Sequence, residues 1–307
     1  MKVILAGSTG TIGRPLLKAL RDNGHESIAI IRNPANRGLV ENLGAVAVVA
    51  DVMDRNALLT ALDGRTADAV MHQATALRGA SPRLRQDDPT NALRTKGTEH
   101  LLEAATSVGA SRFVVQSLVT GYGYHNHGTR PLTEDDPFGA LRGHYADPVV
   151  SAAAEAERLA FSASGVDGIA LRYGMFYGPR AFSDLFADLM RKRTPVAPRG
   201  GGGEAAFVHI EDAASAAIAA LEHGRPGNAY NIADGNPTTW GEFASAVARA
   251  HGTPRPVTAP RWLLRLVGPY LEALMAQTSM RIDNIKARTE LDWKPRYASV
   301  GEGLAKR

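Results

Sequence analysis

The chain has 307 residues, of which 44% are hydrophobic, and its 35 basic and 31 acidic residues give a formal net charge of +4. This length and composition predict one large hydrophobic core with a smaller attached lobe and exclude a disordered chain. Cysteine is absent, which excludes disulfides, thiolate nucleophiles and cysteine metal ligands, and we expect a cytoplasmic location.

The apolar and basic runs of the chain are short. The apolar run over 262–275 is interrupted by Gly268 and Pro269 and is shorter than the roughly 20 residues of a membrane span. The longest basic cluster, 191–193, lies near the end of an expected helix, where the helix dipole favours cations. We therefore expect neither a membrane nor a nucleic-acid partner.

The N-terminal segment combines a buried strand, a glycine-rich loop and a helix. The apolar run over 2–6 leads into three glycines, a helical pattern covers 11–23, and a second apolar run follows at 28–31. Glycines permit the tight turn and the close approach of a phosphate, and a helix N-terminus attracts anions. The spacing is typical of a βαβ dinucleotide site. The expected pyrophosphate-binding residues are Gly7, Ser8, Thr9, Gly10, Thr11, Ile12 and Gly13.

Strand and helix patterns alternate through the first half of the chain. The strands are expected at 2–6, 27–32, 45–50, 68–72, 112–117 and 166–172. This alternation predicts an α/β fold, a Rossmann doubly wound parallel sheet. Beyond residue 172 we expect a loop at 173–179, helices at 182–193, 211–223 and 239–251, and short strands at 206–209 and 229–232.

The residue that ends the second strand bears on the choice of nicotinamide cofactor. A carboxylate there usually binds the 2′-hydroxyl of the adenosine ribose, but this chain has Arg32, with Arg37 close behind. A guanidinium favours a 2′-phosphate, so we predict NADP(H); the alternative is a surface arginine ending an edge strand. After the third strand, Asp51 and Val52 are expected to bracket the adenine, unless Asp51 caps the helix that begins near Asp54.

The expected elements divide the chain into two interleaved parts. Residues 1–172, with contributions from about 205–235, are assigned to an NADP-binding Rossmann domain. Residues 173–307 are assigned to a smaller, mainly helical substrate lobe.

An ordered set of motifs extends over nearly the whole chain. It comprises the three glycines, Asp51-Val52, Leu171 to Pro179, Phe207 to Asp212 and Tyr230 to Ile232. This set resembles the extended short-chain dehydrogenase/reductase family, which implies a Rossmann domain with a C-terminal substrate lobe. In that family the segment matching 171–179 packs near the nicotinamide. We therefore add Gln73, Ala74, Tyr173 and Phe176 to the expected cofactor site.

The catalytic pair of that family is missing. In the family, a Tyr-x-x-x-Lys pair shares one helix face, where the ammonium lowers the phenol pKa from about 10. None of the eight tyrosines has a lysine four residues later, and no lysine lies between Lys96 and Lys192. Alignment with the family's helix puts Val149 at the tyrosine position and Ala153 at the lysine position. The resemblance is therefore to the atypical branch of the family.

Two residues are left as candidates for catalysis. The family's serine or threonine falls at or beside Leu118, which leaves Ser117 as the nearest hydroxyl, and Tyr145 precedes the altered helix. Each is also compatible with a structural role.

An intact cofactor loop without the usual acid implies that the substrate supplies the proton. A carbonyl flanked by an aromatic hydroxyl, as in polycyclic polyketides of the angucyclinone type, would protonate its own alkoxide. We therefore expect an NADPH-dependent ketoreductase of antibiotic biosynthesis that acts on a small aromatic ketone. The alternatives are a non-catalytic NADP-sensing regulatory protein and a nucleotide-sugar epimerase or dehydratase, which normally needs the missing pair.

Three loops carry weaker signals. His125 and His127 lack a third ligand at zinc spacing, so no metal site is expected. The basic loop 78–85 would close over the cofactor or substrate, or is simply exposed. The glycines at 200–203 suggest a mobile lid connector.

Overall fold

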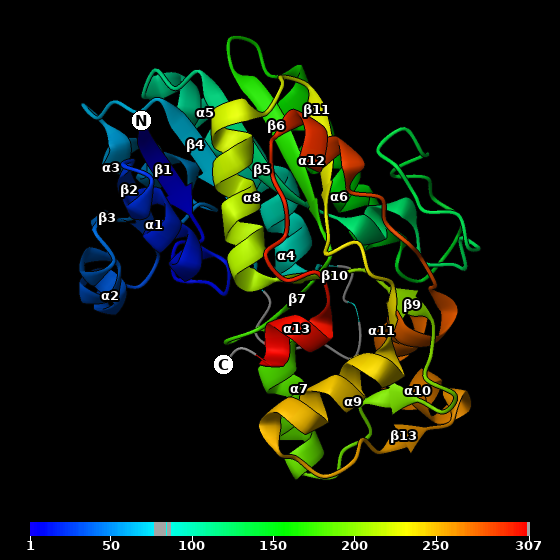
Figure 1. Cartoon of the computed structure of the whole chain (residues 1–307). Coiled ribbons are helices and arrows are strands. Elements are labelled where there is room, and N and C mark those ends of the chain that lie inside the picture. Colours follow the sequence, from blue (N-terminus) through cyan, green and yellow to red (C-terminus); the bar gives the residue numbers. More distant parts are fainter. Residues whose placement is uncertain (77–83, 85–86, 306–307) are drawn as a thin grey trace.

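The computed structural model describes residues 1–76, 84 and 87–305 (Figure 1). Its centre is a seven-stranded sheet in the order β11-β6-β5-β4-β1-β2-β3, with every neighbouring pair parallel. The strands are β1 (Lys2–Ala6), β2 (Glu26–Ile31), β3 (Ala45–Val49), β4 (Ala69–His72), β5 (Arg112–Leu118), β6 (Asp167–Tyr173) and β11 (Asn228–Ile232). The predicted Rossmann-type α/β fold is confirmed.

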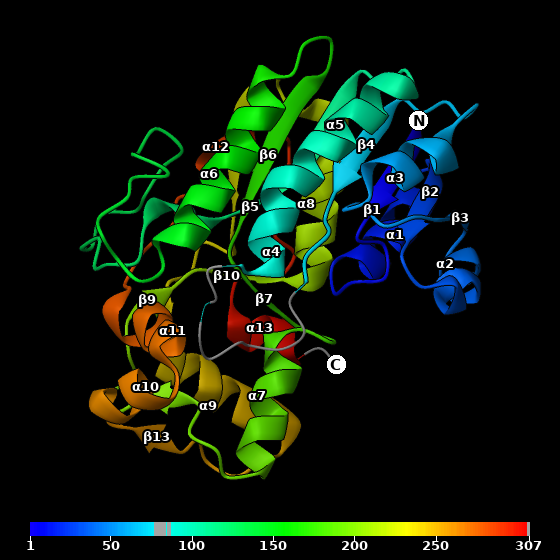
Figure 2. The same cartoon turned by 180° about the vertical axis from the view of Figure 1, so that it is seen from behind.

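Helices cover both faces of the sheet, which explains why its strands are continuous apolar runs. Val3 and Leu5 pack into one apolar cluster, while Ile4 and Ala6 pack into a second cluster on the opposite face. The first cluster is covered by α1 (Gly13–Asp22), α2 (Arg37–Asn42), α8 (Ile210–His223) and α12 (Ile285–Glu290). The second is covered by α3 (Arg55–Leu62), α5 (Thr98–Ser107) and α6 (Asp147–Ser162) (Figure 2).

A smaller lobe lies beyond the carboxyl ends of the strands (Figures 1 and 2). Its helices are α7 (Phe182–Arg191), α9 (Trp240–His251), α10 (Arg261–Val267), α11 (Pro269–Glu272), the short π-helix η4 (Ala273–Gln277) and α13 (Val300–Ala305). Its short strands are β8 (Ala197–Pro198), β9 (Glu204–Ala205), β12 (Thr238–Thr239) and β13 (Thr258–Ala259). An apolar cluster joins this lobe to the start of α6 through Val149 and Val150.

The connections around the carboxyl edge include several short helical turns. They are η1 (Pro34–Asn36), α4 (Pro89–Ala92), the short π-helix η2 (Leu93–Gly97) and η3 (Val119–Tyr122). Strand β11 forms one edge of the sheet although α7, β8 and β9 of the lobe precede it in the sequence and the other lobe elements follow it. The Rossmann part and the lobe are therefore interleaved along the chain.

One sequence-based expectation is wrong. Residues 173–179 are not a loop: β6 continues to Tyr173, and β7 (Met175–Tyr177) pairs with β10 (Phe207–His209). Gly174 permits this pairing, because a Cβ there would lie 2.8 Å from the carbonyl oxygen of Ala206. In the glycine connector, Gly203 packs closely, since a Cβ on it would lie 1.9 Å from the carbonyl oxygen of Thr278, whereas Gly200 has no atom within 4 Å of an added Cβ.

Apart from Leu84, the basic loop lies outside the described residues. Within the described part, the helices are too short or too polar to traverse a lipid bilayer.

Candidate active site

The glycine loop connects β1 to α1 at the carboxyl edge of the sheet. Gly7 has φ +88°, and a Cβ on it would lie 2.4 Å from the backbone of Gln73. A Cβ on Gly13 would lie 2.1 Å from the Gly7 carbonyl oxygen, to which the Gly10 N–H donates at 3.0 Å. Ile12 precedes α1 without a capping side chain, and the first turn has no acidic residue. The loop and helix N-terminus therefore fit the pyrophosphate of a dinucleotide.

The other loop residues support this cradle. The Ser8 hydroxyl donates to the Ile30 carbonyl at 3.0 Å and ties the loop to β2. The Thr9 carbonyl accepts from Arg14 Nε at 3.1 Å. The Thr11 hydroxyl donates to the Arg180 carbonyl at 3.4 Å, so the segment after β7 borders the cofactor loop.

The two arginines expected at the ribose lie at the end of β2. Arg32 follows the strand directly and is exposed, and Arg37 begins α2. Arg37 Nη1 lies 3.4 Å from the Glu41 carboxylate, in an exposed ion pair. Both guanidinium groups are therefore accessible to an anion at this edge of the sheet.

Asp51 and Val52 follow β3. Asp51 Oδ1 accepts from the Met53 N–H, whereas Asp54 caps α3 by accepting from the Ala57 N–H. The alternative role of Asp51 as the helix cap is therefore wrong. Val52 is buried, and its carbonyl accepts from the His100 ring at 2.8 Å.

Two buried polar side chains without hydrogen-bond partners in the described part of the chain lie at the carboxyl ends of β4 and β6. Gln73 follows β4 and Tyr173 ends β6, and both are at least 97% buried. The Gln73 amide and the Tyr173 hydroxyl face one another, yet neither has a hydrogen-bond partner of normal geometry among the described residues. Leaving buried polar groups unpaired costs about 1–3 kcal/mol each. The two groups therefore fit the polar nicotinamide half of a cofactor.

The other two residues expected near the nicotinamide lie beside this pair. The Phe176 ring contacts the Tyr173 ring edge-on, with the ring centroids 5.2 Å apart, and Ala74 follows Gln73 beside Gly7.

The two positions that the resemblance assigns to the missing catalytic pair lie on α6. Val149 is 4% exposed and Ala153 is fully buried. Val149 belongs to an apolar cluster that also contains Leu118, Tyr124 and Tyr270. Burial raises the pKa of both Tyr124 and Tyr270. The tyrosines that meet here are therefore weaker acids than free tyrosine, the opposite of a lysine-activated phenol.

Ser117 points into a buried ion pair. Its hydroxyl donates to Glu157 of α6, whose carboxylate pairs with Arg172 of β6 at 2.8 Å. The Arg172 guanidinium lies 3.7 Å from the Phe138 ring centroid and donates to the Tyr122 hydroxyl at 2.9 Å. The sequence does not reveal this network, because its members are far apart in the chain.

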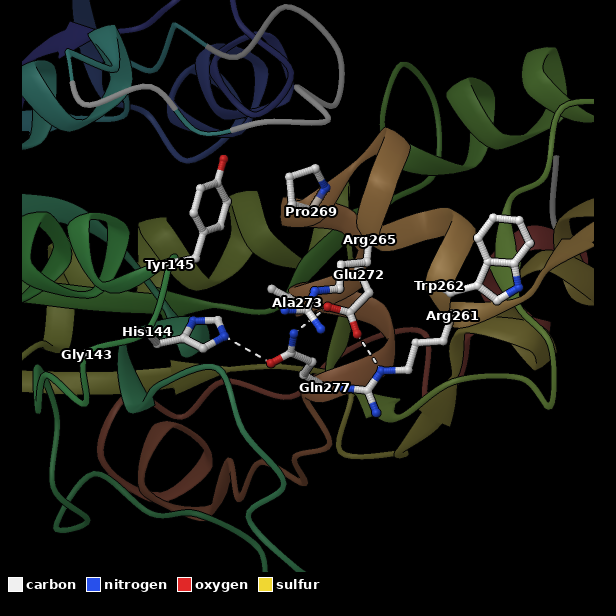
Figure 3. Close-up of a pocket in the computed structure, with 10 residues that line it drawn as sticks. All are labelled: Gly143, His144, Tyr145, Arg261, Trp262, Arg265, Pro269, Glu272, Ala273 and Gln277. Carbon is white, nitrogen blue, oxygen red and sulfur yellow. Dashed lines mark hydrogen bonds and ion pairs between the residues drawn. The ribbon is translucent and has the colours of Figure 1, made fainter.

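Tyr145 lies at the surface, between the Rossmann part and the lobe. Its side chain is 45% exposed, and its hydroxyl donates to the Leu84 carbonyl at 3.1 Å. It lines a cavity of about 640 Å³ with His144 and residues of α10, α11 and η4 (Figure 3). His144 Nε2 lies 3.1 Å from Gln277 Oε1. The residues lining this cavity come from neither the glycine loop nor the ends of β4 and β6.

The two loop histidines pack against one another. The ring centroids of His125 and His127 lie 3.8 Å apart, and burial lowers the pKa of His125 to about 4. In the described part of the chain, no three His, Cys, Asp or Glu side chains gather as a metal site would require.

Comparisons with known proteins identify the family. The sequence model of the NAD dependent epimerase/dehydratase family matches residues 3–233. A 3-diazoavenalumate denitrifying reductase from a Streptomyces species is 37% identical over 100% of both chains. A 4-hydroxy-2-methyl-3-oxo-4-farnesyl-3,4-dihydroquinoline-1-oxide ketoreductase from Stigmatella aurantiaca is 27% identical over 82% of this chain and 74% of its own.

A solved structure extends the likeness to the fold. The UDP-glucose 4-epimerase of Bifidobacterium longum, in complex with NAD⁺ and UDP, has a TM-score of 0.81, is 20% identical, and matches over 99% of this chain and 96% of its own. The chain therefore belongs to the NAD dependent epimerase/dehydratase family, within the extended short-chain dehydrogenase/reductases, and is an oxidoreductase that uses a nicotinamide cofactor.

Proposed function

We propose that the chain transfers a hydride to an aromatic diazonium ion and thereby releases dinitrogen from the ring. One observation carries the proposal: Val149 and Ala153, the residues expected at the positions of the family's proton-donating pair, are buried and have no proton to donate. The relative that is 37% identical over its full length is named as a denitrifying reductase of a diazo compound. An aromatic ring is required, because alkyl diazonium ions lose dinitrogen without help.

This reaction consumes no proton overall. A bound reduced nicotinamide supplies a hydride, one hydrogen with an electron pair. The terminal nitrogen of the diazonium ion accepts it, which cancels the positive charge and gives an aryl diazene, Ar–N=N–H. The C–N bond then breaks, dinitrogen leaves, and the ring carbon keeps the electron pair and takes a proton in place of the one lost from nitrogen. The balance is ArN₂⁺ + H⁻ → ArH + N₂, whereas a ketone needs both H⁻ and H⁺.

The side chains of this chain would then bind and orient rather than exchange protons. The glycine loop and the N-terminus of α1 would hold the pyrophosphate, and Arg32 with Arg37 would select a 2′-phosphate, hence NADP(H). Gln73 and Tyr173 would gain the hydrogen-bond partners that they lack in the described part of the chain. Leu118 and Val149 would keep water away from the accepting atom.

A second candidate is reduction of a polycyclic aromatic ketone with a neighbouring hydroxyl, of the angucyclinone type. The same missing pair supports it, because the substrate hydroxyl would protonate the alkoxide. The ketoreductase from Stigmatella aurantiaca is a weaker likeness in its favour. Epimerisation of a nucleotide sugar fits less well, because that chemistry normally uses the tyrosine and lysine.

The two candidates differ in what they release and where the hydrogen goes. A hydroxybenzenediazonium salt and a hydroxylated polycyclic ketone would each be incubated with NADPH or NADH, and dinitrogen would be measured by mass spectrometry. In D₂O we expect deuterium on the ring carbon, because the diazene N–H exchanges with solvent. The denatured enzyme corrects for direct reduction of the salt by the cofactor. Turnover of the ketone with no enzyme-dependent dinitrogen release would favour the second candidate.

A further inference from the structure

Arg94 is a buried cation for which the described residues provide no carboxylate partner. It lies in η2 and is 6% exposed. Its Nη1 donates to Asn91 Oδ1 at 3.2 Å, and in the described part of the chain no carboxylate forms an ion pair with it. The Asp88 carboxylate accepts from the N–H groups of Thr90 and Asn91 as the cap of α4. Burial lowers the pKa of Arg94, and the charge of Asp88, which forms no ion pair with it, only opposes that fall.

Two phenols share the surroundings of this guanidinium. The hydroxyls of Tyr124 and Tyr270 form a hydrogen bond to each other at 2.9 Å. Burial raises the pKa of both tyrosines, and the charge of Arg94 opposes that rise. Tyr124 follows η3 and Tyr270 lies in α11, so the Rossmann part and the lobe each contribute one hydroxyl to this pair, and both phenols sense the charge of Arg94.

Arg94, Tyr124 and Tyr270 lie near Val149, the position that the resemblance assigns to the missing catalytic tyrosine. Tyr124 and Tyr270 belong to the same apolar cluster as Leu118 and Val149, and η2 packs against α6. An apolar wall next to an uncompensated guanidinium suits a ligand with a flat apolar body and an anionic end.

We propose that Arg94, together with the hydroxyls of Tyr124 and Tyr270, binds the carboxylate of an aromatic acid, and that the substrate is a diazonium carboxylate. The proposal rests on the proposed function. A planar guanidinium can form two parallel hydrogen bonds to a carboxylate, and the phenols can donate further ones. Because the diazonium end is cationic, Arg94 repels it, so the cluster also fixes which end of the substrate points away toward the hydride.

Binding is tested with an acid that cannot be reduced. In the presence of NADP⁺, 4-hydroxycinnamate and its neutral amide are titrated calorimetrically into the wild type and Arg94→Gln. We expect the variant to lose at least about tenfold in affinity for the acid and to leave binding of the amide unchanged. Arg94→Lys keeps the charge without the planar fork and should recover part of the affinity. Equal affinity of wild type and Arg94→Gln for the acid would overturn the proposal.

The matched control is Arg265→Gln, at an exposed arginine of α10 that lines the neighbouring cavity. It should bind the acid as the wild type does. Thermal unfolding separates ligand binding from a structural role: without ligand, Arg94→Met should melt at a higher temperature than the wild type, because it removes an uncompensated buried charge. A lower melting temperature would assign Arg94 to the fold and contradict the proposal.

Turnover separates this inference from the proposed function. With a diazonium carboxylate, Arg94→Gln should raise KM with little change in kcat, and with the matching methyl ester it should change neither. If Arg94→Gln loses affinity for the acid while the wild type releases no dinitrogen, the anion site is upheld and the diazonium reaction is refuted. If the wild type and Arg94→Gln have the same KM for the acid, and the same KM for the ester, the anion site is refuted while the diazonium reaction is still supported.

Discussion

Ser117 and Glu157 are joined by a hydrogen bond across the interface between β5 and α6. Glu157 also carries the ion pair with Arg172, so the serine hydroxyl completes the surroundings of a buried carboxylate. This arrangement directs the Ser117 hydroxyl into the protein core.

We expect Ser117→Ala to lower the free energy of unfolding by about 1 kcal/mol and to leave kcat within twofold of wild type. Glu157→Gln should cost about 3 kcal/mol or more, because it leaves the Arg172 charge uncompensated. Urea denaturation followed by circular dichroism measures both. A large fall in kcat for Ser117→Ala with unchanged stability would instead make the serine catalytic.

Gly7→Ala should abolish cofactor binding while Gly24→Ala does not. Both glycines have positive φ, +88° and +74°, but only Gly7 faces backbone atoms within 4 Å of an added Cβ. The two variants therefore share the strain of the left-handed conformation and differ in the steric clash. Calorimetric titration with NADP⁺ is the measurement, and similar affinities for the two variants would count against the loop as the pyrophosphate site.

Arg32→Glu should reverse the cofactor preference. A carboxylate at the end of β2 would repel the 2′-phosphate of NADP and accept from the 2′-hydroxyl of NAD. We expect the ratio of the two dissociation constants to change by at least about tenfold in favour of NAD. Arg21→Glu, at the exposed far end of α1, is the control for loss of a positive charge. An unchanged ratio in Arg32→Glu would show that this side chain does not contact the ribose.

Tyr145→Phe should retain at least half of the wild-type kcat. The hydroxyl bonds to the backbone of Leu84 and lies on an exposed side chain, so its loss should loosen a surface contact without removing a proton source. Stopped-flow measurement of NADPH oxidation provides the rate. Abolished turnover with unchanged cofactor affinity would place a proton donor at Tyr145 and replace the mechanism proposed above.

Stability should fall as the pH rises from about 4 to about 7, because of Asp234. Burial raises its pKa from 3.8 to about 7, so between these values the folded chain keeps a proton that the unfolded chain has released. Asp234→Asn should remove this slope and raise the free energy of unfolding at pH 8 by on the order of 2 kcal/mol. Asp63→Asn, at an exposed residue after α3, should leave the slope unchanged. A parallel pH dependence in wild type and Asp234→Asn would exclude Asp234 as its source.

The cofactor loop and the strands could be predicted because their signals are local. Gly7 and Gly13 are needed by neighbouring backbone, and the strand Lys2–Ala6 is recognisable as an apolar run. The strand at Met175–Tyr177 could not be foreseen, because its pairing partner, Phe207–His209, comes from a distant segment. A short strand of this kind takes its stability from the tertiary contact rather than from its own pattern.

The grouping of Arg94 with Tyr124 and Tyr270 could not be predicted from the sequence either. Tyr124 and Tyr270 are 146 positions apart, and nothing near either residue in the sequence indicates that their hydroxyls meet. The missing Tyr-x-x-x-Lys pair, in contrast, is evident from the sequence because its spacing is fixed by one helix. The sequence therefore reveals that the catalytic tyrosine is absent, whereas only the structure reveals that Arg94 is buried in the same region.

The late position of β11 in the chain has a consequence for synthesis on the ribosome. The other six strands of the sheet emerge before residues 228–232, so β6 has an open hydrogen-bonding edge while residues 174–227 are being translated. Unpaired strand edges are sites of intermolecular association. We therefore expect rapid elongation through residues 174–227, or a chaperone, to limit association through this edge before β11 pairs with β6.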